Sequence, residues 1–138
     1  MPAADFLDTN VVIYAYGTDA SKKSRALDLL ASGPTISTQV LNETVSVFRR
    51  KKMMADAMIG TAIDDLAAWC QVVQVDIATI KLALDLAERY QFSYYDALMV
   101  AAAVAADCTT LYSEDLHHGL VVSGSLSIRN PFIDAAPH

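Results

Sequence analysis

The chain has 138 residues, of which 54 % are hydrophobic and 19 % are charged. This predicts one globular domain, residues 1–138, with a substantial core, and it excludes wholesale disorder. The longest apolar run, residues 97–106, is much shorter than the roughly 20 residues of a membrane span. The early acids Asp5 and Asp8 argue against a signal peptide, and the two cysteines, Cys70 and Cys108, are typical of reduced core thiols. We therefore expect a cytoplasmic protein without a membrane segment.

The net charge of −6 disfavours a nucleic-acid partner, but the basic residues are unevenly distributed. Residues 49–52 read Arg-Arg-Lys-Lys, and Lys22, Lys23 and Arg25 form a second group. Two interpretations remain open. These cations are solvated side chains at helix ends, where positive charge is favourable near a C-terminus, or they contact phosphates.

In chain order, the hydrophobic pattern alternates between strands and helices. A strand at residues 4–8 precedes a helical turn from Val11 and a helix that begins at Asp19 or Ser21 and ends at Leu30, before Gly33. Further strands are expected at residues 35–37, 72–75, 109–112 and, at an edge of the sheet, 126–128. Further helices are expected at residues 38–52, 56–69, 76–90 and 93–106.

Strands separated by helices predict right-handed crossovers and therefore an α/β fold. We expect a three-layer sandwich with a central parallel sheet of four to five strands flanked by helices. In such folds ligands bind beyond the carboxyl ends of the strands. Residues 8–10 (Asp-Thr-Asn) end the first strand and interrupt two apolar runs, and residues 113–115 (Ser-Glu-Asp) follow the strand 109–112. Both polar segments are therefore expected at this crevice.

Two helices carry acids in unusual places. Glu43 lies on the border of the apolar arc of helix 38–52, close to the direction of Arg50, so it extends either into solvent or into the crevice. Asp96 follows the capping residue Ser93 in a first helical turn, where an acid is favourable in any case. Because residues 97–106 are apolar on every side, this helix is expected to be buried, and a buried carboxylate needs a counter-charge or a metal.

Four acids are thus expected at one end of the sheet: Asp8, Glu43, Asp96 and Asp115. Their mutual repulsion is acceptable when cations bind between them, and an all-oxygen ligand set favours Mg²⁺ or Mn²⁺. Such an ion can deprotonate a water and stabilise the leaving oxygen of a phosphodiester.

Other polar residues are assigned supporting roles in this hypothesis. Thr9, Asn10 and Ser113 are expected to orient ligands or water from a second layer around the acids. Arg50 shares a helix face with Glu43 and is the best candidate for a phosphate contact. The pair at residues 117–118, His-His, lacks a third partner for a metal and is interpreted as a polar loop.

Four segments resemble, in this order, the motif blocks of PIN-domain nucleases, and most closely the VapC-type toxins of bacterial toxin–antitoxin pairs: FLDTNVVIYA, STQVLNE, SYYDALMVAAA and TLYSEDLHHG. The resemblance extends from Phe6 to Pro131 and implies a metal-dependent endoribonuclease with a PIN-like parallel-sheet fold. By motif position, three acids match the family's central carboxylates: Asp8, Glu43 and Asp96. Asp115 matches the fourth, with Ser113 where the family often has Thr, but the intervening Glu114 leaves this fourth assignment open.

The same resemblance implies three partners: an RNA substrate, a second copy of the chain in a homodimer, and a cognate antitoxin whose tail covers the active-site groove. The apolar helix 97–106 and the pair Tyr94-Tyr95 would suit such contacts, although core packing is the more common role for each.

Three other classes of protein share part of this pattern. A phospho-receiver domain also groups acids at strand ends, but its family has a lysine after the last strand, and there is none between Arg89 and Arg129. A phosphotransfer hydrolase with an Asp-x-Asp start is disfavoured because position 10 is Asn. A PIN fold that binds RNA or protein without cutting remains an alternative.

Overall fold

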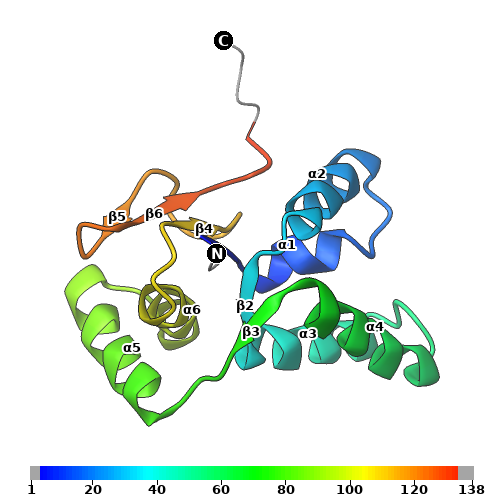
Figure 1. Cartoon of the computed structure of the whole chain (residues 1–138), viewed down its shortest axis with the longest axis horizontal. Coiled ribbons are helices and arrows are strands. Elements are labelled where there is room, and N and C mark those ends of the chain that lie inside the picture. The colour runs from blue at the N-terminus through cyan, green and yellow to red at the C-terminus, as the bar shows by residue number, and fades with distance from the viewer. Residues whose placement is uncertain (1–3, 134–138) are drawn as a thin grey trace.

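The computed structural model describes residues 4–133 and has helices on both faces of a six-stranded sheet (Figure 1). The strands are β1 (Asp5–Leu7), β2 (Thr35–Ser37), β3 (Gln71–Val73), β4 (Thr110–Tyr112), β5 (Val121–Val122) and β6 (Leu126–Arg129). The helices are α1 (Thr9–Tyr14), α2 (Ala20–Ala31), α3 (Thr38–Arg50), α4 (Asp56–Trp69), α5 (Ile77–Tyr90) and α6 (Tyr94–Ala105).

The strand order is β3-β2-β1-β4-β6-β5, and every neighbouring pair except β5 and β6 is parallel. The central strand β1 pairs on both sides, with Phe6 opposite Thr35 of β2 and opposite Leu111 of β4. Phe6, Leu7 and Leu111 are fully buried. Continuous burial of this kind is characteristic of parallel strands that are covered on both faces, so the expected mostly parallel α/β sheet is confirmed.

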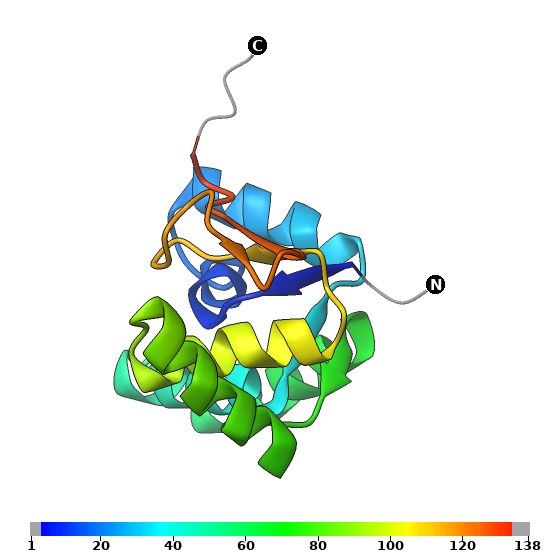
Figure 2. The same cartoon turned by 90° about the vertical axis from the view of Figure 1, so that its left-hand side faces the viewer.

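Helices on the two faces complete the layers. Figure 2 shows α2 on one face of the sheet and α6 on the other, with α5 packed on the outer side of α6. All residues of α6 from Ala97 to Ala103 are buried, whereas Ala105 is exposed and Val104 and Ala106 are half-buried. The expected burial of residues 97–106 is therefore confirmed for the first seven of them. None of the helices within residues 4–133 is long and apolar enough to cross a membrane.

Two details of the sheet differ from expectation. The sheet has six strands rather than four or five, and β6 is not at the edge because β5 pairs antiparallel with it. The two strands form a tight hairpin whose turn contains Ser123 (φ 52°) and Gly124 (φ 72°). A Ser-Gly pair that joins two short apolar segments is a hairpin signal, but a strand of two residues is too short to be predicted from periodicity.

Helix boundaries agree with expectation within a few residues. The first helix begins at Thr9 instead of Val11, because the Asp8 side chain caps it by accepting a hydrogen bond from the Thr9 amide. Asp19, not Ser21, caps α2. The thiols of Cys70 and Cys108 are buried as expected, and burial raises the pKa of the Cys70 thiol to about 11.

Candidate functional site

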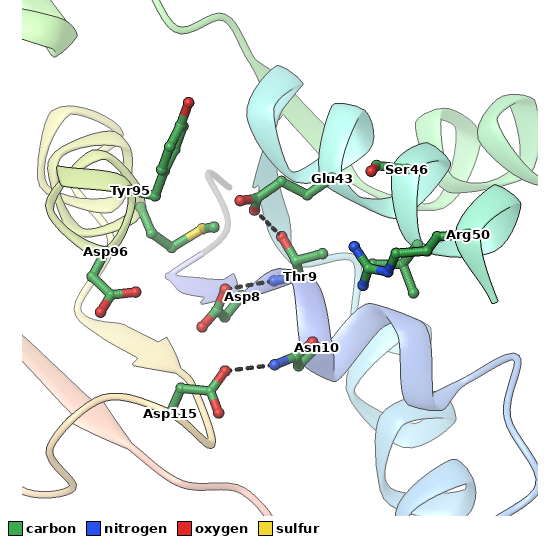
Figure 3. A pocket seen from close by; sticks show the side chains of 11 residues that line it. Asp8, Thr9, Asn10, Glu43, Ser46, Arg50, Tyr95, Asp96 and Asp115 are labelled. Atoms are coloured by element: carbon green, nitrogen blue, oxygen red, sulfur yellow. Dashed lines mark hydrogen bonds between the residues drawn. The ribbon is translucent and has the colours of Figure 1, made fainter. Parts of the chain in front are cut away.

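The four expected acids line one cleft of about 320 Å³ at the carboxyl end of the sheet (Figure 3). They come from four separate places in the chain: Asp8 after β1, Glu43 on α3, Asp96 in the first turn of α6, and Asp115 after β4. The parallel order of β2, β1 and β4 is what joins them, because the carboxyl ends of parallel strands meet at one edge. The residues that follow these strands thereby share a pocket.

Asp8 is the most buried of these carboxylates, with 9 % of its surface exposed. Its Oδ1 accepts a hydrogen bond from the Thr9 amide and its Oδ2 accepts one from the Ser113 hydroxyl, each 2.7 Å long. Burial raises the pKa of Asp8 to about 6. The two hydrogen bonds oppose that rise, while the negative charges of Asp115 and Glu43 add to it. Asp8 is therefore a carboxylate that a nearby cation would stabilise strongly.

Thr9 and Asn10 hold two of the other acids. The Thr9 hydroxyl donates to Glu43 Oε1 (2.5 Å), and the Asn10 amide nitrogen donates to Asp115 Oδ2 (2.5 Å). The polar triplet between two apolar runs thus has a structural explanation. Its first residue caps α1, and the next two each hold a carboxylate from a distant segment.

Ser113 is fully buried and organises the loop after β4. Its hydroxyl donates to Asp8, and its oxygen accepts hydrogen bonds from the amides of Asp115 and Leu116, both 3.2 Å. Through this one side chain the loop that carries Asp115 is tied to Asp8.

Asp96 stands on the opposite wall of the cleft from Asn10 (Figure 3). The expected cap is present, because the Ser93 hydroxyl oxygen accepts from the Asp96 amide (3.3 Å). The Asp96 carboxylate makes no hydrogen bond or ion pair with any residue in the described part of the chain, 4–133, so it is available to a ligand.

Glu114 and Asp115 have different surroundings. Asp115 lines the cleft, whereas Glu114 is bound by two residues outside it, accepting hydrogen bonds from Tyr14 Oη (2.6 Å) and Lys22 Nζ (2.5 Å). Burial alone would raise the pKa of Glu114, but the contacts with Lys22 and Tyr14 outweigh it and lower the pKa. The geometry therefore favours Asp115 over Glu114 as the fourth acid of the site.

Four lining residues were not among the site residues expected from the sequence: Ser46, Val47, Met99 and Tyr95, of which only Tyr95 was considered at all, for contacts with a protein partner. Helical spacing could have found most of them, because Ser46 and Val47 follow Glu43 by three and four positions, and Met99 follows Asp96 by three. Arg50, which was expected, also lines the cleft, on the far side of Glu43 from Tyr95 (Figure 3). Tyr95 is 62 % exposed, so it is not a core residue.

The donor set of the cleft suits a hard cation, since its lining within residues 4–133 has four carboxylates and one guanidinium but no His or Cys. However, within residues 4–133 no three Asp, Glu, His or Cys side chains are already arranged to hold a metal ion. Glu43 and Asp115 are instead hydrogen-bonded to Thr9 and Asn10. The acids thus share a cleft without forming a preassembled ion site.

A family model described as PIN domain matches residues 6–119, which is most of the chain. The chain belongs to the PIN-domain family, as its motif blocks indicated. No curated protein gives a significant match.

Solved structures agree on the fold. Mycobacterium tuberculosis VapC20, described as a Sarcin-Ricin loop cleaving toxin, is 22 % identical, with a TM-score of 0.62 over 80 % of this chain and 89 % of that one. A toxin–antitoxin complex from Klebsiella pneumoniae is 16 % identical, with a TM-score of 0.70 over 92 % and 97 %. VapBC2 from Rickettsia felis, bound to a DNA fragment from its promoter, is 20 % identical, with a TM-score of 0.65 over 91 % and 97 %.

Proposed function

We propose that this protein is a Mg²⁺- or Mn²⁺-dependent endoribonuclease that hydrolyses RNA phosphodiester bonds, and that it is the toxin of a type II toxin–antitoxin pair. The observation that carries the proposal is the shared cleft of four acids, Asp8, Glu43, Asp96 and Asp115. A cleft with this charge repels an RNA phosphate unless a cation lies between the two. Membership of the PIN family and the toxin neighbours support the same conclusion.

In this proposal each residue has a separate task. Asp8 and Asp96 would bind the cation directly. Asp8 is held in place by hydrogen bonds from Thr9 and Ser113, whereas the Asp96 carboxylate is open to the cleft. Glu43 and Asp115, which Thr9 and Asn10 hold at the cleft by hydrogen bonds, would complete the ligand set. When bound, the cation activates water for attack on the phosphate and neutralises the leaving oxygen.

Arg50 has the complementary task of binding the substrate. Its guanidinium lines the same cleft as the acids and lies near Glu43 on α3 (Figure 3). A planar guanidinium can donate two parallel hydrogen bonds to a phosphate, which positions the strand without reading its sequence.

The direct test is cleavage of a labelled structured RNA with Mg²⁺ or Mn²⁺, compared with EDTA. Asp8→Asn and Asp96→Asn should each reduce the cleavage rate by about a hundredfold or more, since each removes a charge that holds the cation. Lys51→Ala is the matched control, because Lys51 is exposed and outside the cleft. Equal cleavage by wild type and Asp8→Asn would indicate a contaminant. Magnesium-dependent binding without cleavage would support a non-catalytic PIN fold instead.

The proposed protein partners rest on other observations. Structures similar to this chain include toxin–antitoxin complexes, which supports a cognate antitoxin. An apolar row on α5, formed by Ile77, Ile80 and Leu84, is exposed and supports a homodimer. Light scattering of the wild type and of Leu84→Asp would test the dimer, which should dissociate in the variant.

The antitoxin hypothesis predicts a small DNA-binding protein in the adjacent reading frame, whose co-expression abolishes cleavage.

A further inference from the structure

Helix α3 carries two adjacent rows of side chains that line two different hollows. The row containing Glu43 and Arg50 faces the acidic cleft, and the row containing Asn42 and Arg49 faces a second hollow of about 660 Å³ beside the start of α4. Ser46 and Arg50 line both hollows. The acidic cleft and the second hollow therefore adjoin at Ser46 and Arg50, in the C-terminal half of α3.

The second hollow, called here the basic groove, is positively charged. Among the described residues that line it, three are basic (Arg49, Arg50 and Lys52) and one is acidic (Asp56). Arg49 Nε and Asp56 Oδ1 are 3.9 Å apart, and both side chains are more than two thirds exposed. An exposed pair of this kind is weak and screened by salt, so the arginine remains available to another anion.

Lys52 is present at a position where the backbone favours glycine. Its φ of 51° is in the left-handed region, directly after the capping residue Lys51 of α3. A side chain is disfavoured there by the contact of its Cβ with the backbone, and Gly is the usual choice. Gln91, Asp107 and Ser123 also have positive φ, so the backbone alone assigns Lys52 no role. Its place in the lining of the basic groove is what makes its ammonium group a candidate for binding an anion.

We propose that the basic groove binds the phosphate backbone of the same RNA strand whose scissile phosphate occupies the acidic cleft, and that the strand passes between them over Ser46 and Arg50. This inference rests on the proposed nuclease function. The groove offers guanidinium, ammonium, amide and hydroxyl groups, which are the usual sequence-independent contacts to phosphate and sugar. Val45 is its one large apolar side chain among the described lining residues, so it lacks the buried apolar anchor that a docked protein segment needs.

Binding can be tested independently of cleavage, with the Asp8→Asn protein and a fluorescent single-stranded oligoribonucleotide in Mg²⁺ buffer. When Arg49→Ala and Lys52→Gly are introduced together into the Asp8→Asn protein, its affinity for the oligoribonucleotide should fall by about tenfold at moderate salt. The slope of log K against log salt should become shallower by about 0.7 for each phosphate contact removed. The control is Lys51→Ala, which removes one positive charge from the residue next to Lys52 but outside the groove. It should leave both the affinity and the salt slope unchanged.

Lys52→Gly also separates a binding defect from a folding defect. It relieves the left-handed backbone, so the variant should be at least as stable as the parent while it binds RNA less tightly. Gln91→Gly is the matched control, because Gln91 (φ 61°) is the left-handed cap of α5 and carries no charge. It makes the same backbone change and should leave RNA affinity unaltered.

The outcomes distinguish this inference from the nuclease proposal. If Lys51→Ala weakened RNA binding as much as the groove variants do, net charge would explain the effect, and the proposed RNA-binding role of the groove would be wrong. Unchanged affinity and salt slope would overturn it as well, even if the wild type cuts RNA. Groove-dependent RNA binding by a protein that never cleaves would leave the groove standing and overturn the nuclease proposal instead.

Discussion

Lys22 Nζ lies 2.5 Å from Oε2 of Glu114, and this ion pair separates Glu114 from the neighbouring acid Asp115. Lys22 comes from α2, and Tyr14 of α1 also binds the Glu114 carboxylate. The two consecutive acids are thereby directed to different surroundings. Glu114 joins α1 and α2 to the loop after β4, whereas Asp115 faces the cleft.

Glu114→Gln and Asp115→Asn should therefore have unequal effects on cleavage. We expect Asp115→Asn to lower kcat by about a hundredfold, because it removes a proposed cation ligand, and Glu114→Gln to lower it less than about tenfold. Steady-state cleavage of a labelled RNA measures both. If Glu114→Gln were the more damaging change, the assignment of the fourth acid would have to be reversed.

The raised pKa of Asp8 predicts a specific pH dependence of stability. Because the folded-state pKa is about 6 and the ordinary value is 3.8, the native state holds a proton that the unfolded state has lost between these values. Protonated Asp8 thus contributes fully to the free energy of unfolding below about pH 4, and this contribution is lost as the pH rises through 6. The loss amounts to about 3 kcal/mol of stability. The Asp8→Asn variant does not lose this stability, because an asparagine side chain does not titrate.

Urea unfolding with EDTA at about pH 4.5 and pH 7.5 measures the difference in free energy of unfolding between Asp8→Asn and wild type. Relative to the wild type, Asp8→Asn should be more stable at about pH 7.5 than at about pH 4.5 by about 2 kcal/mol. Fixed costs of the substitution, such as an altered hydrogen bond to Ser113, cancel in the comparison. A difference that does not change with pH would mean that Asp8 titrates normally.

Cation binding should restore what Asp8 loses at neutral pH. In EDTA the wild type carries four carboxylates in one cleft, so Mg²⁺ or Mn²⁺ at about a hundredfold over its Kd should stabilise it by about 2.7 kcal/mol. Asp96→Asn should show a much smaller stabilisation. Differential scanning fluorimetry with each ion provides the measurement, and Ca²⁺ and Na⁺ at equal ionic strength serve as controls. Equal stabilisation of wild type and Asp96→Asn would exclude Asp96 as a ligand.

Ser113→Ala should destabilise the protein more than a serine substitution elsewhere. It removes one donor to Asp8 and the acceptor of two backbone amides in a fully buried position, which costs about 1–3 kcal/mol. Ser46→Ala on the exposed surface of α3 should change stability by less than about 0.5 kcal/mol. Urea unfolding of both variants at neutral pH tests this, and similar values for the two would argue against the Ser113 network.

Local sequence signals predicted the elements but not all of their ends. Ser93 and Asp19 are capping residues that can be read from a short window, and both cap the helices expected of them. Helix α1 begins two residues before the expected Val11, because Asp8 both follows the first strand and caps the helix. The strand β5 was missed because its two residues pair through a hairpin with β6, and no periodicity signals so short a strand.

The site shows the same division between local and long-range information. Four acids and the expected phosphate contact Arg50 line one cleft, and the order of the parallel strands explains why that could be expected. The partners of Thr9 and Asn10 could not be predicted, because each hydrogen bond joins residues more than thirty positions apart. The separation of Glu114 from Asp115 depends on Lys22, which is 92 positions away from Glu114 in the chain.

The amino-acid sequence by itself determined the kinds of side chain available: hard oxygen ligands at the ends of apolar strands, a buried apolar helix behind Asp96, and a basic run at the end of α3. Propensity, capping and hydrophobic period act over a few residues and are therefore visible in one dimension. The tertiary structure alone decided which carboxylate faces the cleft, which hydroxyl holds it, and that the acidic cleft adjoins the basic groove at Ser46 and Arg50. Those relationships depend on strand order and helix packing, which bring distant segments within hydrogen-bonding distance.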